Sequence, residues 1–261
     1  MTTSLETSIA PESGAGRDTT DHSVERARHA RISGVRPARL PFRWFYVGMA
    51  AAASITTVVG FSYSYKQRTA AGYVFSSAAT LHAALFFSWV GLFLAQTLLV
   101  ATHRIHAHRR LGIATACVAA AMLVTAPPLA IAAAARGVFP GDDLVFLFDI
   151  LVDLFCFGVF VVAGIYNRQR STVHNRWMLL ATTSLLGPAV SRLPIAIDRP
   201  GVIVGLVLLF LTAPILFDLL SGRRPHPVSA WGGLVLFVSV PLRHAVGQTN
   251  AWHQLATSLT R

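Results

Sequence analysis

Charged residues are scarce in this sequence. They make up 13% of its 261 residues, whereas a soluble globular domain usually carries about 25%. So few charges cannot cover a water-facing surface, and 54% of the residues are hydrophobic. We therefore expect the chain to lie in a lipid bilayer.

Acidic residues and lysine are fewer still. Eleven acidic residues face 22 basic ones, which gives a formal net charge of +11, and Lys66 is the only lysine. An excess of arginine can indicate nucleic-acid binding. Here the arginines lie mostly beside apolar runs, which is typical of the loops that set membrane topology. We expect no nucleic-acid partner.

The familiar enzyme signatures are absent from the sequence. Its two cysteines, Cys117 and Cys156, lie inside apolar runs and form no CxxC or Cys/His zinc pattern. G-x-S-x-G, HExxH, P-loop and GxGxxG motifs are also missing. The sequence gives no support to a hydrolase, a kinase or a nucleotide-binding enzyme.

The first 40 residues lack the apolar core of a signal peptide. Their polar composition cannot bury enough apolar surface to fold alone, so we predict a disordered, basic cytoplasmic tail over 1–40. Its end is rich in arginine: Arg26, Arg28, Arg31, Arg36, Arg39 and, just beyond, Arg43. This segment is expected to rest on anionic lipid.

Long apolar runs fill the rest of the chain and predict an all-α, polytopic transmembrane helical bundle. A span needs roughly 20 residues, and lipid leaves backbone amides no choice but a helix. We predict seven spans within a domain over 41–252, followed by a short C-terminal tail over 253–261. The predicted spans are 42–62, 76–102, 111–135, 144–166, 176–197, 202–221 and 229–248.

Arginine placement predicts the orientation of the bundle. The segments 103–110, 167–175 and 222–228 carry most of the basic residues between spans. Because basic loops stay in the cytoplasm, the N-terminus should be cytoplasmic and the C-terminus outside.

Five ionisable residues fall in the outer half of the predicted spans, where isolated charge is costly. They are His82, Asp149, Asp153, Arg192 and His244. Asp149 and Asp153 are four residues apart and share one helix face. One interpretation is a structural ion pair of either aspartate with Arg192. The other is a polar pocket for a metal, a haem, a quinone head group or a proton path.

A second set lies near the cytoplasmic ends: Gln96, His103, His106, His108 and His174. The H-x-H pair His106 and His108 would face one way in an extended link and point about 200° apart in a helix. These histidines either sit at the interface among arginines or form a ligand set. The flanking arginines favour phosphate, anionic lipid or haem propionates over a cation. Asp218 is expected to pair with Arg223 or Arg224.

Three stretches carry a resemblance to a known group: "LHAALFFSWVGLFLAQTLLVATHRIHAHRRLG", "HNRWMLLATTSLLGPAVSRL" and "FDLLSGRRPHPVSAWGGLVLFVSVPLR". They resemble uncharacterised bacterial multi-pass membrane proteins, which implies a bacterial inner (plasma) membrane location. The matching motif residues include Arg109, Gly112, Arg176, Asp218, His226 and Trp231.

H-R-x-L-G and H-x-R-W-M are also loosely similar to predicted membrane proteins with histidines of the cytochrome b561 type. In this chain the histidines are not placed two per helix. This likeness implies haem b, while residue chemistry leaves a divalent metal open.

Three functional hypotheses follow from these patterns. The first is a haem- or metal-binding redox protein, with His108 and His174 as the inner ligand pair and His82 with His244 as the outer pair. The second is a proton-coupled transporter or permease whose coupling residues would be Asp149, Asp153, Arg192 and His82. The third is a non-catalytic scaffold or assembly factor.

Overall fold

A computed structural model describes residues 42–139 and 141–261. The predicted tail over 1–40 and its lipid contact lie outside these residues. Within them the chain forms helices and no strand, which confirms the all-α bundle. The helices are α2 (Phe42–Ala70), α3 (Ser77–Ala101), α4 (Ile105–Ala134), α5 (Asp143–Tyr166), α6 (Ser171–Ser184), α7 (Gly187–Val190), α8 (Pro200–Leu220), α9 (Pro227–Gly247) and α10 (Asn250–Leu259).

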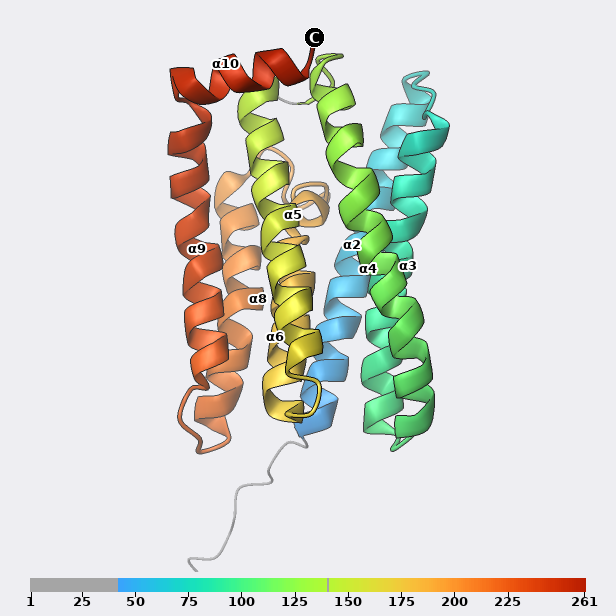
Figure 1. Ribbon diagram of the computed structural model, residues 1–261, viewed down its shortest axis with the longest axis vertical. Coiled ribbons are helices and arrows are strands. Elements are labelled where there is room, and N and C mark those ends of the chain that lie inside the picture. The colour runs from blue at the N-terminus through green and yellow to red at the C-terminus, as the bar shows by residue number, and fades with distance from the viewer. Residues whose placement is uncertain (1–41, 140) are drawn as a thin grey trace, which may run out of the picture. The chain divides into compact units, whose positions relative to one another are not determined.

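Six helices are long and apolar enough to cross a membrane: α2, α3, α4, α5, α8 and α9. Each has at least 21 residues, or more than about 30 Å of helix, which matches a hydrocarbon core. Figure 1 shows them side by side. The connections 102–104, 167–170 and 221–226 lie at one end of this bundle, here called the arginine-rich end.

The predicted span 176–197 is not one helix. α6 ends at Ser184, α7 is a single turn, and turns lead on to Pro200. Pro188 is the second residue of α7, after Gly187, and its nitrogen has no hydrogen to donate to the preceding turn of helix. Every residue from Leu179 to Leu186 is buried. This burial explains the broken helix, because irregular backbone is tolerated at membrane depth only where protein covers it.

α4 begins at Ile105, six residues before the predicted span. The basic segment 103–110 is therefore mostly helix, and only residues 102–104 connect α3 to α4. The H-x-H pair consequently lies on a helix, and its two side chains diverge.

The segment expected as a short C-terminal tail forms most of α10. Thr249 caps this helix by accepting a hydrogen bond from the Trp252 amide (3.3 Å). Figure 1 shows α10 lying across the end of the bundle opposite the arginine-rich end. The Trp252 indole donates to the Leu144 carbonyl on α5 (2.8 Å), and Trp252 and Ala256 pack into a small core with Leu147.

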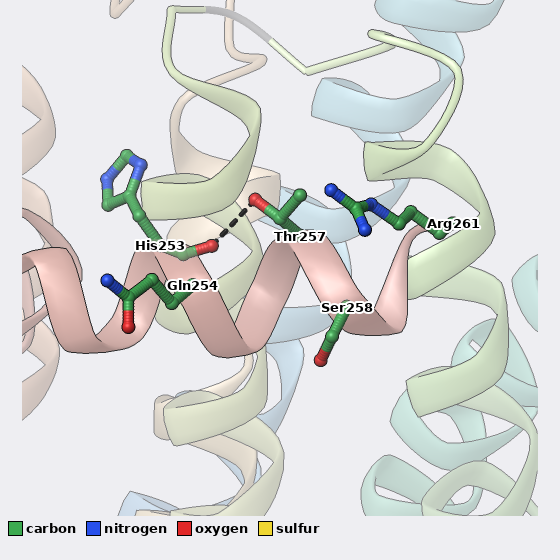
Figure 2. Close-up of a pocket in the computed structure, with 5 residues that line it drawn as sticks. All are labelled: His253, Gln254, Thr257, Ser258 and Arg261. Carbon is green, nitrogen blue, oxygen red and sulfur yellow. Dashed lines mark hydrogen bonds between the residues drawn. The ribbon is translucent and has the colours of Figure 1, made fainter.

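Figure 2 shows polar side chains along α10, around a surface hollow of about 320 Å³. They are His253, Gln254, Thr257, Ser258 and Arg261. The Thr257 hydroxyl donates to the His253 carbonyl (2.7 Å). Because α10 and the terminal residue alone line this hollow, it is a feature of one helix surface.

Apolar side chains cover much of the outside of the long helices. Val124, Phe155 and Val162 are 66–73% exposed. Inside, Trp89 and Phe157 meet edge to face with ring centroids 4.8 Å apart. Exposed apolar side chains on this scale are costly in water and suit a lipid-facing surface.

Candidate functional site

A cavity of about 1200 Å³ opens between α2, the α3–α4 hairpin and the α5–α6 hairpin. Its deeper wall is apolar and includes Trp89, Phe93 and Val161. Towards the arginine-rich end it is lined by His108 and His174, and we call it the histidine cavity. Its mixture of an apolar wall and a few convergent polar groups is typical of a ligand site.

Gln96 holds one side of the His108 ring. In the orientation that satisfies all of its neighbours, the Gln96 amide nitrogen donates to His108 Nδ1 (2.5 Å). The amide oxygen then accepts from the Gly112 amide (2.9 Å) and the Thr115 hydroxyl (3.1 Å). A Cβ on Gly112 would lie 3.7 Å from the Gln96 side chain. His108 and Gly112 of the H-R-x-L-G motif thus both contact Gln96.

His174 is held in a similar way on the opposite wall. Its Nδ1 lies 2.8 Å from the Gly164 carbonyl of α5. A carbonyl can only accept, so Nδ1 carries the hydrogen and Nε2 has a free lone pair. The His108 and His174 rings both line the cavity and lie edge to face, with centroids 6.3 Å apart and planes at 83°.

The structure therefore brings together three of the five residues of the predicted inner set: Gln96, His108 and His174. His108 is the fourth residue of α4, and His174 is the fourth residue of α6. His106 does not line the cavity, because two residues of helix turn it about 200° away from His108.

Arg176 and Asp218 form a buried ion pair beside this cavity. Arg176 Nη2 donates to both Asp218 oxygens (2.5 and 2.7 Å), and Arg176 Nη1 donates to the Tyr46 hydroxyl (2.6 Å). The Asp218 side chain is 1% exposed and that of Arg176 is 5% exposed. Asp218 was expected to pair with Arg223 or Arg224. Its partner is instead Arg176, on the neighbouring helix α6.

His226 joins the same network. Its amide donates to Asp218 (3.1 Å), and its Nδ1 accepts from the Val228 amide (3.2 Å), which caps α9. Three motif residues, Arg176, Asp218 and His226, thus meet at the arginine-rich end. Another motif residue, Trp231, is 67% exposed on α9.

Acid should weaken this end of the bundle through His226. Burial, and secondarily the Arg176 charge, lower the pKa of His226 below its usual value, although Asp218 opposes the shift. A lowered folded-state pKa means that the stability is present above the ordinary pKa of about 6.5 and is lost as the pH falls through the folded-state value. Protonation also ends the cap, which is worth about 1 kcal/mol.

We expect His226→Asn to keep the cap and to flatten the decline in unfolding free energy between about pH 7 and pH 5. His226→Ala should instead lose about 1 kcal/mol already at pH 8. Equilibrium unfolding in detergent micelles at several pH values measures both. A His226→Asn protein whose decline equals that of the unaltered protein would contradict the assignment.

The residues of the predicted outer set do not meet in one pocket but make separate contacts on different helices. Asp153 and Asp149 both pair with Arg243 of α9, Asp153 by a short hydrogen bond and Asp149 at 3.6 Å. The aspartates do share one face of α5, as expected. The partner is Arg243 rather than Arg192, because α9 packs directly against α5.

Arg192 makes other contacts, on the side of α2. Its Nη1 donates to the Pro188 carbonyl (2.6 Å), and its guanidinium stacks 5.0 Å from the Phe61 ring centre. His82 Nδ1 is buried without a hydrogen-bond partner among the described residues. His244 lies 3.2 Å from the Gln248 amide at an exposed position. The predicted outer histidine pair, His82 with His244, therefore has no contact that joins it in this part of the chain.

A protein-only metal centre finds no support in the described ranges. No group of three or more His, Cys, Asp or Glu side chains converges there. Two histidines at one cavity suit a metal only when the metal brings further ligands of its own, as a haem does.

Sequence reasoning did not single out two residues of these networks, Tyr46 and Arg243. The cost of intramembrane charge applies to Arg243 as it does to the aspartates, and that signal could have found the pair.

Comparison with family models, with curated proteins and with solved structures gives no match. The class is nevertheless defined by the fold: this is a multi-pass integral membrane protein with an all-α bundle. The resemblance to bacterial membrane proteins, and the bacterial inner-membrane location that it implies, stay predictions.

Proposed function

We propose that this protein binds haem b in the histidine cavity, with His108 and His174 as the two axial ligands, and that it serves as a membrane redox protein. The observation that carries the proposal is the pair of cavity imidazoles whose ring centres lie 6.3 Å apart. Two imidazoles bound on opposite sides of one metal, at about 2 Å each, would place their ring centres roughly 6–6.5 Å apart.

The surroundings of both rings suit metal ligation. A ligating histidine usually gives its second nitrogen to a carbonyl or another acceptor, which fixes the ring and the tautomer. His174 already does this with Gly164 (2.8 Å). Neither Nε2 has a hydrogen-bond partner among the described residues, and that of His174 already has a free lone pair for a ligand.

Gln96 sets the tautomer of His108. While its amide nitrogen donates to Nδ1, the His108 hydrogen sits on Nε2 and that nitrogen cannot bind iron. Rotation of the amide by half a turn would present the oxygen to Nδ1–H, but it would also bring that oxygen 3.1 Å from the His108 carbonyl oxygen and the amide nitrogen 2.9 Å from the Gly112 nitrogen. Iron binding through Nε2 would therefore require the Gln96 side chain to move away from this position.

The cavity also suits the rest of a porphyrin. Its volume of about 1200 Å³ exceeds the usual range for small-ligand pockets. Aromatic and aliphatic side chains such as Trp89, Phe93 and Met178 line it and would contact the macrocycle. When bound, haem iron supplies one-electron transfer chemistry. This chain's part is to hold the two imidazoles and to exclude water.

One arrangement favours the alternative of a proton-coupled permease. Asp149 and Asp153 share a single guanidinium, Arg243, which leaves one carboxylate able to take a proton. That group lies on α5 and α9, and none of its three side chains lines the histidine cavity. Loss of the haem proposal would leave this alternative and the scaffold hypothesis standing.

The test is optical. We expect the purified protein, loaded with haem b in detergent, to show the reduced-minus-oxidised Soret and α bands of a six-coordinate haem. His108→Leu and His174→Leu should each abolish this spectrum, because one axial ligand is lost. His106→Leu is the matched control and should leave it unchanged. No such bands in correctly folded protein, or unaltered bands in both cavity variants, would remove the proposal.

A further inference from the structure

The histidine cavity carries a cluster of positive charge with no acidic counterpart. Arg43, Arg109 and Arg168 line it, and no Asp or Glu does. We infer that Arg109 and Arg168, with Arg43, bind the acidic groups of the ligand, so that haem lies with its propionates towards the arginine-rich end. This inference rests on the proposed function.

The three arginines reach the cavity from three separate parts of the fold. Arg43 is in the first turn of α2, Arg109 follows His108 on α4, and Arg168 lies in the connection between α5 and α6. Each therefore has a different backbone support, and all three line the same cavity. Arg109 and Arg168 stand on the same two hairpins that carry the histidines.

None of the three has a carboxylate partner among the described residues. The ion pairs there involve Arg176, Arg243 and His253 instead. Arg43 lies 2.6 Å from His103 Nε2, which holds its guanidinium beside the connection between α3 and α4. Three uncompensated guanidinium groups at one cavity repel one another, and a bound dianion would remove that repulsion.

Carboxylate chemistry matches these side chains. A guanidinium presents a planar fork of donors that fits a carboxylate through two parallel hydrogen bonds. Two carboxylates on one edge of a flat apolar molecule would meet the arginines while the apolar part contacts Trp89 and Phe93. The alternative is that these arginines serve only to fix membrane topology. Substituting neighbouring arginines that do not line the cavity distinguishes this role from carboxylate binding.

Arg110 and Arg170 are the control residues for this comparison. Both lie within two residues of a cavity arginine, both are exposed, and neither lines the cavity. Removing them changes the charge of this end by the same amount as removing Arg109 and Arg168. A purely topological role would make the two pairs equivalent.

The experiment compares two ligands in two double variants. Haem b and its dimethyl ester, in which the propionates are masked, are titrated into the full-length protein and followed by the Soret band. We expect the unaltered protein to bind haem b at least tenfold more tightly than the ester. Arg109→Gln with Arg168→Gln should weaken haem b binding by about 10–100-fold and leave ester binding unchanged. Arg110→Gln with Arg170→Gln should alter neither.

The outcomes distinguish this inference from the proposed function. If both ligands bind equally well and neither double variant discriminates between them, the arginine inference is overturned while haem binding stands. If neither ligand gives a six-coordinate spectrum, both are overturned. Displacement of haem b by added phosphatidylglycerol, with no preference over the ester, would assign the arginines to a lipid phosphate and also overturn the inference.

Discussion

Asp218→Asn should lower the free energy of unfolding by about 3–5 kcal/mol, more than any other single change considered for this protein. The substitution keeps the shape of the side chain and removes its charge. Arg176, whose side chain is 5% exposed, would then keep a full positive charge with only the Tyr46 hydroxyl and neutral groups as partners. An unpaired buried charge of this kind is far more costly than the intact pair is favourable.

Reversible unfolding in mixed micelles measures the loss. Asp198→Asn is the matched control, because Asp198 is exposed and its left-handed backbone, with φ of 57°, is one that asparagine tolerates. A loss no larger than that of the control would contradict the prediction. Replacing both Arg176 and Asp218 by leucine should recover much of the stability, since no orphan charge remains.

Gly60→Ala and Gly48→Ala should change stability in opposite directions, although both add one methyl group to α2. A Cβ at Gly60 would overlap the backbone carbonyl oxygen of Ala189 and come within 3.5 Å of Arg192 Cβ. A carbonyl cannot rotate away as a side chain can. We expect overpacking to cost about 1–3 kcal/mol at this position.

Nothing lies within 4 Å of a Cβ added at Gly48. Alanine there should stabilise the helix by up to about 1 kcal/mol, because alanine forms helices better than glycine. The same unfolding measurement, made on both variants in one detergent, gives the comparison. Equal stability of the two variants would show that α2 does not approach the broken segment as closely as described.

Helix existence could be predicted from the sequence because lipid imposes a simple rule on long apolar runs. Six of the seven predicted spans correspond to long helices. The fifth predicted span, 176–197, is not one continuous helix. Its interruption depends on burial by neighbouring helices, and Gly187 and Pro188 alone do not indicate that burial. The start of α4 was missed because basic residues at a helix end look like a loop.

Side-chain partners were harder to predict than helices. The sequence indicates that Asp149, Asp153 and Asp218 each need a positive partner. In the structure each has one, and the first two share a single arginine. The sequence does not indicate which arginine pairs with which aspartate, because that choice depends on which helices pack together. Nearby Arg223 and Arg224 were preferred for Asp218 on sequence distance, whereas Arg176 lies 42 residues away. The proximity of His108 and His174 was easier to predict, because the short connections beside them hold both residues at one end of the bundle.

The short helix α6 has a consequence for the order of assembly. Its 14 residues extend about 21 Å, less than the roughly 30 Å of hydrocarbon that a stable span must cross. Its neighbours α8 and α9, which pack against it, are synthesised later. Arg176 therefore meets Asp218 only after α8 has been synthesised, so the buried ion pair is completed late in the production of the chain.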